Sequence, residues 1–316
     1  MNCLYCYDSL DAGEPNYHAR CSKKFFGTAE APELPFGLDQ MNELANQVVK
    51  RSVSVTGAQA KLSVDLDNLN RSRRRARFTL VGLWGNYILK PPSEQYESLP
   101  ELEDLTMHLA EVFGIRTVPH SLIRLRSGEL AYITRRVDRV EGRKLAMEDM
   151  CQLTEKLTED KYKGSMEQVG RIIRKFSDNS GFDALEFLEL AVFSFLAGNA
   201  DMHLKNFSLI RSTEGTVSLA PAHDLIATKL AIPQDTEEMA LTINGKKSNL
   251  RKADFGILGE NLGINEKVVA NSFSQFSEAF PGAVAFVGRS FLNERLRDAY
   301  ASLLAERGGR LGIASS

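Results

Sequence analysis

The sequence lacks the features that mark membrane, secreted and strongly nucleic-acid-binding proteins. No stretch approaches ~20 consecutive apolar residues, and the first six residues, Met-Asn-Cys-Leu-Tyr-Cys, lack the basic-then-apolar order of a secretion signal. The 39 basic and 41 acidic residues give a net charge of −2, so no overall basic field exists to attract nucleic acid or a membrane. We therefore expect a cytoplasmic protein with no membrane contact and no direct nucleic-acid binding.

Cysteine is scarce and unevenly placed. The 316 residues include four cysteines, three of which fall within the first 21 residues. Disulfide-stapled secreted domains use many cysteines spread along the chain, so this distribution favours a reducing compartment. Internal repeats and low-complexity tracts are missing as well. The length and the 43% hydrophobic content predict one sizeable globular core or two lobes.

Hydrophobic periodicity predicts two regions of different kind. Strands are expected at 52–66, 77–81, 87–89 and 130–134, with a break at Gly57 inside the first, and a helix at about 100–113. Beyond residue 145 the pattern is mostly helical, and 183–198 is apolar nearly all round, which is typical of a buried helix. The sequence therefore predicts an α+β fold with a small β-rich lobe and a mostly helical lobe.

Three polar residues after the predicted buried helix form the strongest chemical signal. Asp201 and Asn206 have the D-x-x-x-x-N spacing of a kinase catalytic loop, in which one carboxylate receives the proton of the attacking hydroxyl and an amide oxygen reaches the metal. Asp224 follows a strand predicted at 216–220 and offers a second carboxylate for Mg²⁺. The alternative is that Asp201 and Asn206 only cap helices. Their combination with Asp224 favours phosphoryl transfer.

Neighbouring residues of this loop are candidates for further roles. Lys205 is placed to neutralise charge on a transferring phosphate, which makes it a candidate catalytic residue. His203 either contacts the nucleotide or hydrogen-bonds a carbonyl to hold the shape of the loop. The role of His223, next to Asp224, stays open.

Two further segments can contribute to a nucleotide site. Residues 52–61 predict a turn of small residues whose backbone amides can surround phosphates, but with a single glycine the default interpretation is an ordinary β-turn with a solvated Lys61. Lys90 closes an apolar strand, and Glu103 lies in the helix that follows. A kinase needs such a lysine on the nucleotide phosphates and such a glutamate to fix it. A strand-end lysine and an acid favoured by the helix dipole explain each residue alone.

Taken in order, these segments resemble the HipA family of serine/threonine kinase toxins, and among them the short HipT-like forms. The resemblance covers nearly everything from residue 52 onward, and its most specific part is the catalytic-loop stretch. The matching stretches are SVTGAQAK (54–61), YILKPP (87–92), ELEDLTMHLAEVFGI (101–115), YITRRVDR (132–139), GNADMHLKNFSLI (198–210), LAPAHDL (219–225) and, more weakly, DFGILGENLGI (254–264).

The resemblance implies a two-lobed protein-kinase-like fold and a role for each matching residue. Asp201 would be the catalytic base, Asn206 and Asp224 would hold Mg²⁺, and Lys90 would bind the ATP phosphates. The other implied nucleotide-binding positions are Gly57, Ala58, Gln59, Lys61, Glu103, His203 and the hinge Arg135, Arg136 and Val137. The implied domains are a Cys/His module at 1–25, an N-lobe at 26–137 and a helical C-lobe at 138–316.

The family also autophosphorylates in the turn before Gly57, which maps to Ser54, with Thr56 as a second acceptor. A phosphate there adds about −1.5 to −2 charge and would reorder the turn. This chain departs from the family pattern at Leu102, His223 and Val137, and none of these removes a catalytic group. The turn lies ~50 residues from the start, so the extra N-terminal subdomain of long members is expected to be missing. The resemblance implies that a small HipS-like protein supplies it, beside a DNA-binding HipB-like antitoxin.

The N-terminal cysteines are arranged as two ligand pairs. Cys3-x2-Cys6 and His18-x2-Cys21 suit a tetrahedral structural Zn²⁺ site of zinc-ribbon type. The alternative is a metal-free remnant packed on the small lobe, and Cys151 is expected to be a core residue. An arginine run at 71–77 is typical of a solvated hairpin tip; its functional alternative is a contact with an acidic partner or with tRNA held by a substrate enzyme.

These observations favour an ATP- and Mg²⁺-dependent serine/threonine protein kinase that acts as the toxin of a toxin–antitoxin system. The resemblance implies an aminoacyl-tRNA synthetase as its substrate and translation as the process it stops. One competing hypothesis is a pseudokinase-like module that binds nucleotide and an antitoxin without turnover, and another is a zinc-ribbon nucleic-acid adaptor. The intact Asp201, Asn206, Asp224 and Lys90 argue against the first, and the near-neutral charge argues against the second.

Overall fold

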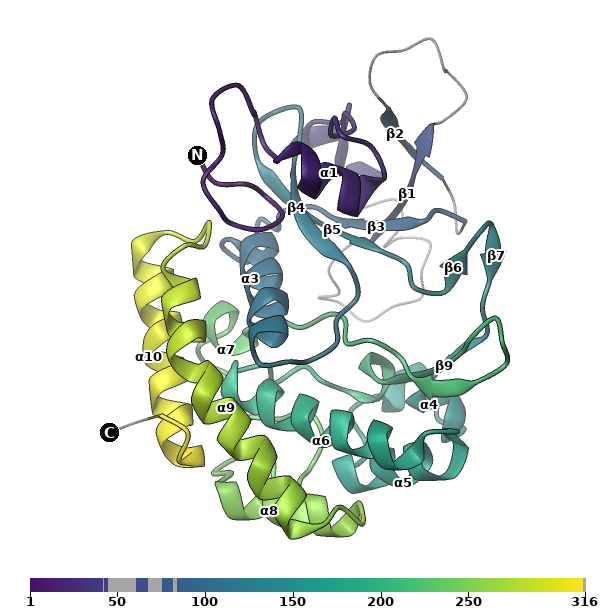
Figure 1. The fold of residues 1–316 in the computed structure, drawn as a ribbon, viewed down its shortest axis with the longest axis vertical. Helices are drawn as coiled ribbons and strands as arrows, with labels where there is room; N and C mark the ends of the chain where they lie inside the picture. The colour runs from purple at the N-terminus through teal and green to yellow at the C-terminus, as the bar shows by residue number, and fades with distance from the viewer. Residues whose placement is uncertain (42, 45–60, 68–75, 82–83, 315–316) are drawn as a thin grey trace. The chain divides into compact units, whose positions relative to one another are not determined.

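The computed structural model describes residues 1–41, 43–44, 61–67, 76–81 and 84–314. The chain divides into two compact units, unit 1 and unit 2. Unit 1 comprises Met1–Asp104, Val118–Arg136 and Arg289–Leu292, and unit 2 comprises Leu105–Thr117, Val137–Gly288 and Asn293–Ser316. Figure 1 shows the course of the chain and labels its elements.

Unit 1 is built on an antiparallel sheet of five strands. In spatial order these are β2 (Arg77–Leu80), β1 (Leu62–Asp67), β3 (Tyr87–Lys90), β5 (Leu130–Arg135) and β4 (His120–Arg124). The strands predicted at 77–81, 87–89 and 130–134 are confirmed to within one residue at their ends. Strand β1 confirms only the last part of the strand predicted at 52–66, because residues 52–60 lie outside the described ones. Strand β4 was missed by the sequence analysis.

Aromatic residues join the N-terminal segment to this sheet. Helix α1 (Ala19–Phe26) ends at Gly27, which takes a left-handed φ of 83°. The ring of Phe26 lies 5.9 Å from that of Phe78 on β2, which in turn lies 5.3 Å from Tyr87 on β3. Edge-to-face contacts of this kind add to the hydrophobic gain of burial. The first 26 residues therefore pack against the sheet as part of unit 1 (Figure 1).

Helix α3 (Leu99–Val112) confirms the helix predicted at about 100–113. Its apolar side chains at helical spacing, including Leu102, Leu105 and Leu109, are fully buried. The chain leaves the helix at Gly114, whose φ of 81° favours glycine. The first turns of α3 belong to unit 1 and the remaining turns to unit 2.

Unit 2 is mainly helical, as predicted. Its helices are α4 (Met150–Leu153), α5 (Met166–Phe176), α6 (Ser180–Leu196), α7 (Thr228–Ala231), α8 (Lys252–Asn261), α9 (Glu266–Val287) and α10 (Glu294–Leu311), with short 3-10 turns η1 (Thr158–Asp160) and η2 (Leu204–Asn206). A small sheet has the order β10 (Val217–Leu219), β9 (Ser208–Arg211) and β8 (Met147–Asp149), and β6 (Arg139–Val140) pairs with β7 (Arg143–Lys144).

Helix α6 is the buried helix that the sequence predicts at 183–198. Every residue from Leu190 to Leu196 is buried, which fits a helix that is apolar all round. The chain turns out of the helix at Gly198, where φ is 73°. A Cβ atom at this position would lie 2.6 Å from Leu303 Cδ2 and 3.2 Å from Lys229 Cβ. Glycine is therefore required by both the backbone and the packing, and it directs the chain into the loop that carries Asp201.

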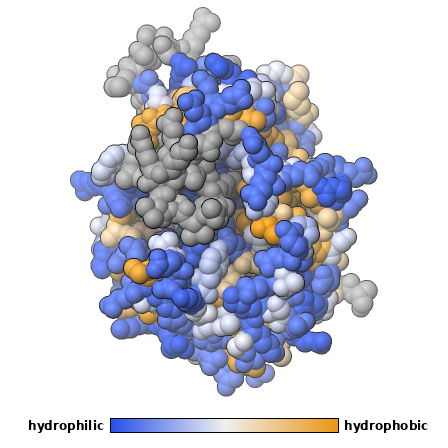
Figure 2. All heavy atoms as spheres, turned by 180° about the vertical axis from the view of Figure 1, so that it is seen from behind, coloured by the Kyte–Doolittle hydropathy of each residue, from blue (hydrophilic) through white to orange (hydrophobic). Residues whose placement is uncertain are grey.

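Hydrophobic residues are mostly enclosed. In the face drawn in Figure 2, the described surface is largely hydrophilic, with smaller apolar areas between the polar ones. Scattered exposed apolar side chains are normal for a folded domain. Among the helices of the described residues, none combines the length and apolar character that a bilayer span requires.

Candidate active site

The loop after helix α6 is held by its own hydrogen bonds. Asn199 Oδ1 accepts from the backbone N–H of Asp201 at 3.1 Å, and the Ala200 N–H donates to Thr228 Oγ1 at 2.7 Å. Asn206 Nδ2 donates to the backbone carbonyl of Asp201 at 3.0 Å. Because the amide nitrogen of Asn206 is used inside the loop, its amide oxygen remains for a metal ion.

A tyrosine hydroxyl contacts the candidate catalytic carboxylate. Tyr162 donates to Asp201 Oδ1 at 2.6 Å, and its ring meets the His203 ring edge-on at 5.1 Å. Burial, reinforced by the bond to Asp201, raises the pKa of Tyr162, so this hydroxyl stays a donor near neutral pH. The sequence analysis missed Tyr162, because it lies 39 residues from Asp201 with no local pattern that joins them.

The charges of both candidate carboxylates act on the buried side chain of His203. Burial lowers the pKa of His203 from 6.5 to about 4, and the charges of Asp201 and Asp224 partly oppose this shift. The imidazole is therefore neutral near pH 7. Its Nδ1 has no hydrogen-bond partner among the described residues. Tyr162 contacts both Asp201 and His203, so these two residues lie together in unit 2, and the charge of Asp224 also acts on the His203 ring.

Asp224 has an unusual backbone conformation. Its φ is 57°, in the left-handed region that non-glycine residues seldom adopt. It follows strand β10, which confirms the strand predicted at 216–220 in shortened form, at Val217–Leu219. His223 Nδ1 lies 3.4 Å from the carbonyl of Pro221, inside the same turn. Strained backbone of this kind is often found where a side chain must be presented to a ligand.

Lys205 forms an ion pair that the sequence analysis did not foresee. Its Nζ lies 2.6 Å from Asp149 Oδ2, and its side chain is 35% exposed. Asp149 also caps helix α4 by accepting from the Gln152 backbone N–H. The pair therefore ties the loop to the start of α4.

Unit 1 contains a second charged pair, which is fully buried. Lys90 Nζ contacts Glu103 Oε1, and the two residues are 3% and 1% exposed. Lys90 also lies 5.3 Å from the ring centre of Tyr132, the residue opposite it on β5. Strand β3 and helix α3 thus bring together the lysine and glutamate that the sequence analysis paired. Burying an ion pair is costly, so its presence favours a functional role.

The other predicted nucleotide positions are only partly described. Ser54, Thr56, Gly57, Ala58 and Gln59 lie outside the described residues, and Lys61 is an exposed residue just before β1. The predicted hinge follows β5: the Arg135 N–H donates to the Pro119 carbonyl and the Arg136 N–H to the Asn86 carbonyl, both at 2.9 Å. The division between the units falls between Arg136 and Val137.

The N-terminal ligand pairs meet in unit 1. The candidate ligand atoms of Cys3, Cys6, His18 and Cys21 all lie within 4.8 Å of one another. Cys151 is buried, as predicted, and lies in helix α4 of unit 2. In the arginine run, Arg77 is an exposed residue of β2, whereas 71–75 lie outside the described residues.

Comparisons with known proteins identify the family. The family model of the HipA-like C-terminal domain matches residues 53–284, more than half of the chain. A putative kinase, Y4dM, of Sinorhizobium fredii is 31% identical over 72% of this chain and 58% of its own length. The serine/threonine-protein kinase toxin HipA of Shewanella oneidensis is 24% identical over 75% of this chain and 58% of its length. The chain thus spans less than two thirds of these relatives.

A solved structure shares the fold. The HipA, HipB and operator DNA complex of Shewanella oneidensis MR-1 contains a chain that matches with a TM-score of 0.67 and 19% identity, over 85% of this chain and 71% of that one. This similarity, with the antiparallel sheets and helices described above, confirms the predicted α+β kinase-like fold. The sequence match and the fold agree, and the chain belongs to the HipA family.

Proposed function

We propose that the chain is an ATP- and Mg²⁺-dependent serine/threonine protein kinase. The observation that carries this proposal is the loop of unit 2 in which Asp201 accepts a hydrogen bond from Tyr162 and Asn206 is anchored to the Asp201 backbone, together with Asp224 presented in a left-handed conformation after β10. Two carboxylates and an amide oxygen are hard oxygen ligands of the kind Mg²⁺ prefers. In unit 1, the buried Lys90–Glu103 pair supports the proposal, because a kinase needs a lysine on the nucleotide phosphates and a glutamate that fixes it.

In the proposed reaction, Asp201 orients a serine or threonine hydroxyl and receives its proton while the oxygen bonds to the γ-phosphorus and ADP leaves. ATP supplies the phosphoryl group, and Mg²⁺ when bound supplies positive charge against it. Tyr162 fixes the carboxylate of Asp201 through the 2.6 Å hydrogen bond. Asn206 and Asp224 would hold the metal, and the left-handed φ of Asp224 fits a carboxylate presented to a ligand.

The biological role is proposed from family membership. We infer that the chain is the toxin of a toxin–antitoxin system, with a HipB-like antitoxin as its partner. The support is its match to a chain from a HipA, HipB and operator DNA complex. A small HipS-like partner, an aminoacyl-tRNA synthetase substrate and autophosphorylation at Ser54 and Thr56 remain parts of this proposal. A phosphate at either hydroxyl would add negative charge beside the nucleotide phosphates and alter activity.

The test is to incubate the purified chain with labelled ATP and Mg²⁺ in a cell lysate. We expect label on the chain and on one major lysate protein, and loss of both with Asp201→Asn, which preserves shape but not the base. Losses of 100-fold or more are typical for a general base. Glu260→Gln, at an exposed position of helix α8, is the matched control and should label normally.

Equal labelling by Asp201→Asn would show that Asp201 is not the catalytic base. Binding of ATP by the unchanged chain, without any label on itself or on a lysate protein, would instead favour a nucleotide-binding module without turnover. Mass spectrometry of the labelled chain would locate the autophosphorylated residue, and a site other than Ser54 or Thr56 would contradict that part of the proposal.

A further inference from the structure

The N-terminal 26 residues contain a ligand cluster that phosphoryl transfer does not use. The turn at residues 3–7 supplies Cys3 and Cys6, and the start of helix α1 supplies His18 and Cys21. Three thiols and one imidazole are the donor set of structural zinc sites, in which four protein ligands surround the metal tetrahedrally. Only two of these ligands share a turn, so their convergence depends on the fold and not on spacing alone.

The distances between the ligand atoms fit a tetrahedron around zinc. With Zn–S bonds of about 2.3 Å and Zn–N bonds of about 2.05 Å, the edge between a sulfur and a nitrogen should be roughly 3.5 Å. Cys6 Sγ and Cys21 Sγ lie 3.5 Å and 3.6 Å from His18 Nδ1. The measured edges therefore match the expected ones, and all four ligand atoms lie within 4.8 Å of one another.

The orientation of His18 gives a second, independent indication. Its other ring nitrogen, Nε2, lies 3.0 Å from the carbonyl oxygen of Ser9. A carbonyl can only accept, so the proton of the neutral ring resides on Nε2 and the lone pair on Nδ1 faces the cysteines. A backbone carbonyl that fixes the imidazole in this way is the usual outer contact of a metal-bound histidine.

This cluster is joined to the part of unit 1 that carries the Lys90–Glu103 pair. Leu4, between the first two cysteines, accepts hydrogen bonds from Ser121 Oγ at 3.0 Å and from the Leu122 N–H at 3.2 Å on strand β4. Tyr7, which directly follows Cys6, donates to Asp104 Oδ2 at 2.7 Å. The turn is therefore attached both to the sheet and to helix α3.

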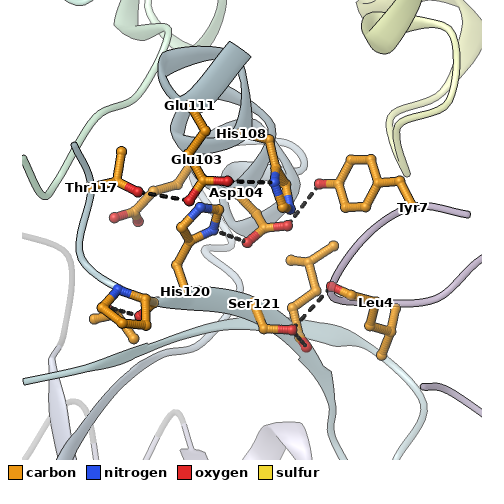
Figure 3. Close-up of polar contacts among 12 residues, drawn as sticks. Leu4, Tyr7, Glu103, Asp104, His108, Glu111, Thr117, His120 and Ser121 are labelled. Atoms are coloured by element: carbon orange, nitrogen blue, oxygen red, sulfur yellow. Dashed lines mark hydrogen bonds and ion pairs between the residues drawn. The ribbon is translucent and has the colours of Figure 1, made fainter. Parts of the chain in front are cut away.

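Asp104 connects the turn at residues 3–7 to strand β4 as well as to helix α3. Its second oxygen, Oδ1, lies 2.7 Å from His120 Nδ1 on β4, and Tyr7, Asp104 and His120 are all buried (Figure 3). Asp104 is the neighbour of Glu103 in the first turns of α3. Tyr7 itself takes a left-handed φ of 63°, which requires the turn around it to hold its shape. A metal ion bound by the flanking cysteines would supply that restraint.

We propose that Cys3, Cys6, His18 and Cys21 bind one structural Zn²⁺. Through the hydrogen bond between Tyr7 and Asp104, the metal-bound turn at residues 3–7 would fix the first turns of α3. These turns position Glu103 against Lys90. The metal site stands on its own geometry. Its effect on nucleotide binding rests on the proposed kinase function.

The metal site is tested by measuring zinc in the purified full chain by mass spectrometry, in the unchanged protein and in Cys6→Ser, Cys21→Ser and Cys151→Ser. We expect one zinc per chain in the unchanged protein and in Cys151→Ser, whose cysteine lies outside the cluster, and at least a tenfold loss in the other two. Replacement by Co²⁺ should give the visible absorption of a tetrahedral cobalt thiolate site. Zinc-free protein that also fails to bind Co²⁺ would overturn the site, as would equal zinc in all four proteins.

The coupling is tested by titrating a fluorescent ATP analogue. Tyr7→Phe should retain one zinc but bind the analogue about three- to tenfold more weakly, because a hydrogen bond to a buried carboxylate is lost. Tyr5→Phe removes a hydroxyl from the same turn and is the matched control, with no more than a twofold change expected. Unaltered affinity in Tyr7→Phe would refute the coupling and leave the zinc site intact. If the unchanged protein binds no analogue while retaining zinc, the kinase proposal fails instead.

Discussion

One lysine–carboxylate pair of unit 1 and one of unit 2 differ in their exposure to water. In unit 1, Lys90 and Glu103 are 3% and 1% exposed, whereas in unit 2 the Lys205 side chain that meets Asp149 is 35% exposed. Water screens the second pair, which is therefore worth little to stability, while the first has lost its hydration and depends on its partner. The Lys90–Glu103 pair is thus enclosed by the protein, whereas the Lys205–Asp149 pair lies at a partly exposed position.

The largest expected effect on stability comes from removing the lysine of the buried Lys90–Glu103 pair. Lys90→Met leaves the carboxylate of Glu103 buried without its cation, which should lower the free energy of unfolding by about 3–5 kcal/mol. The double variant Lys90→Met, Glu103→Gln removes the stranded charge and should recover most of that loss. Urea unfolding measures both. Lys205→Met, the exposed counterpart, should cost about 1 kcal/mol or less. If Lys90→Met and Lys205→Met lower the free energy of unfolding equally, burial does not distinguish the two ion pairs.

A smaller effect concerns pH in unit 2. Burial lowers the pKa of His203 from its ordinary 6.5 to about 4 in the folded chain. Between these two pH values the imidazole is protonated in the unfolded chain but neutral in the folded chain. The stability linked to His203 is therefore full above pH 6.5 and is lost progressively down to pH 4. Between pH 7 and pH 5 the loss should be about 2 kcal/mol.

The measurement compares urea unfolding at pH 7 and pH 5 in the unchanged protein and in His203→Gln, which keeps a polar side chain but cannot titrate. The groups that act on His203 are Asp201, Asp224 and Lys161. We expect the variant to lose about 2 kcal/mol less on acidification. An identical pH dependence in both proteins would mean that the imidazole is not held neutral by burial.

Sequence patterns predicted the features that depend on residues close together in the chain. Helices α3 and α6 and four of the five strands of the unit 1 sheet were predicted, one of them in part, because hydrophobic spacing is a local property. Strand β4 was missed because His120 and Ser121 interrupt its apolar pattern. Both are buried, and their partners, Asp104 and the Leu4 carbonyl, lie 16 and 117 residues away. Polar residues that are satisfied only by distant partners cannot be recognised as core residues from sequence.

The same limit applies to the candidate site. Asp201 and Asn206 lie in one loop, so their spacing indicated their role directly. Tyr162 and Asp149 reach this loop from 39 residues before Asp201 and 56 residues before Lys205, and neither was predicted. Lys90 and Glu103 are intermediate, because a strand followed by a helix keeps them 13 residues apart, and the requirements of a nucleotide site paired them. The depressed pKa of His203 depends on burial, which exists only in the folded chain.

The smallest expected change in stability tests how unit 2 positions its carboxylate. Tyr162 is 43% exposed and donates to Asp201 Oδ1, so Tyr162→Phe should cost about 1 kcal/mol of stability or less. The carboxylate would then sample more orientations, and kcat should fall about three- to tenfold with KM for ATP unchanged, because the lost contact is made to the base and not to the nucleotide. Steady-state kinetics beside Tyr5→Phe separates these effects. A rise in KM for ATP at constant kcat would place Tyr162 among the nucleotide contacts, and unit 2 would then hold Asp201 without its help.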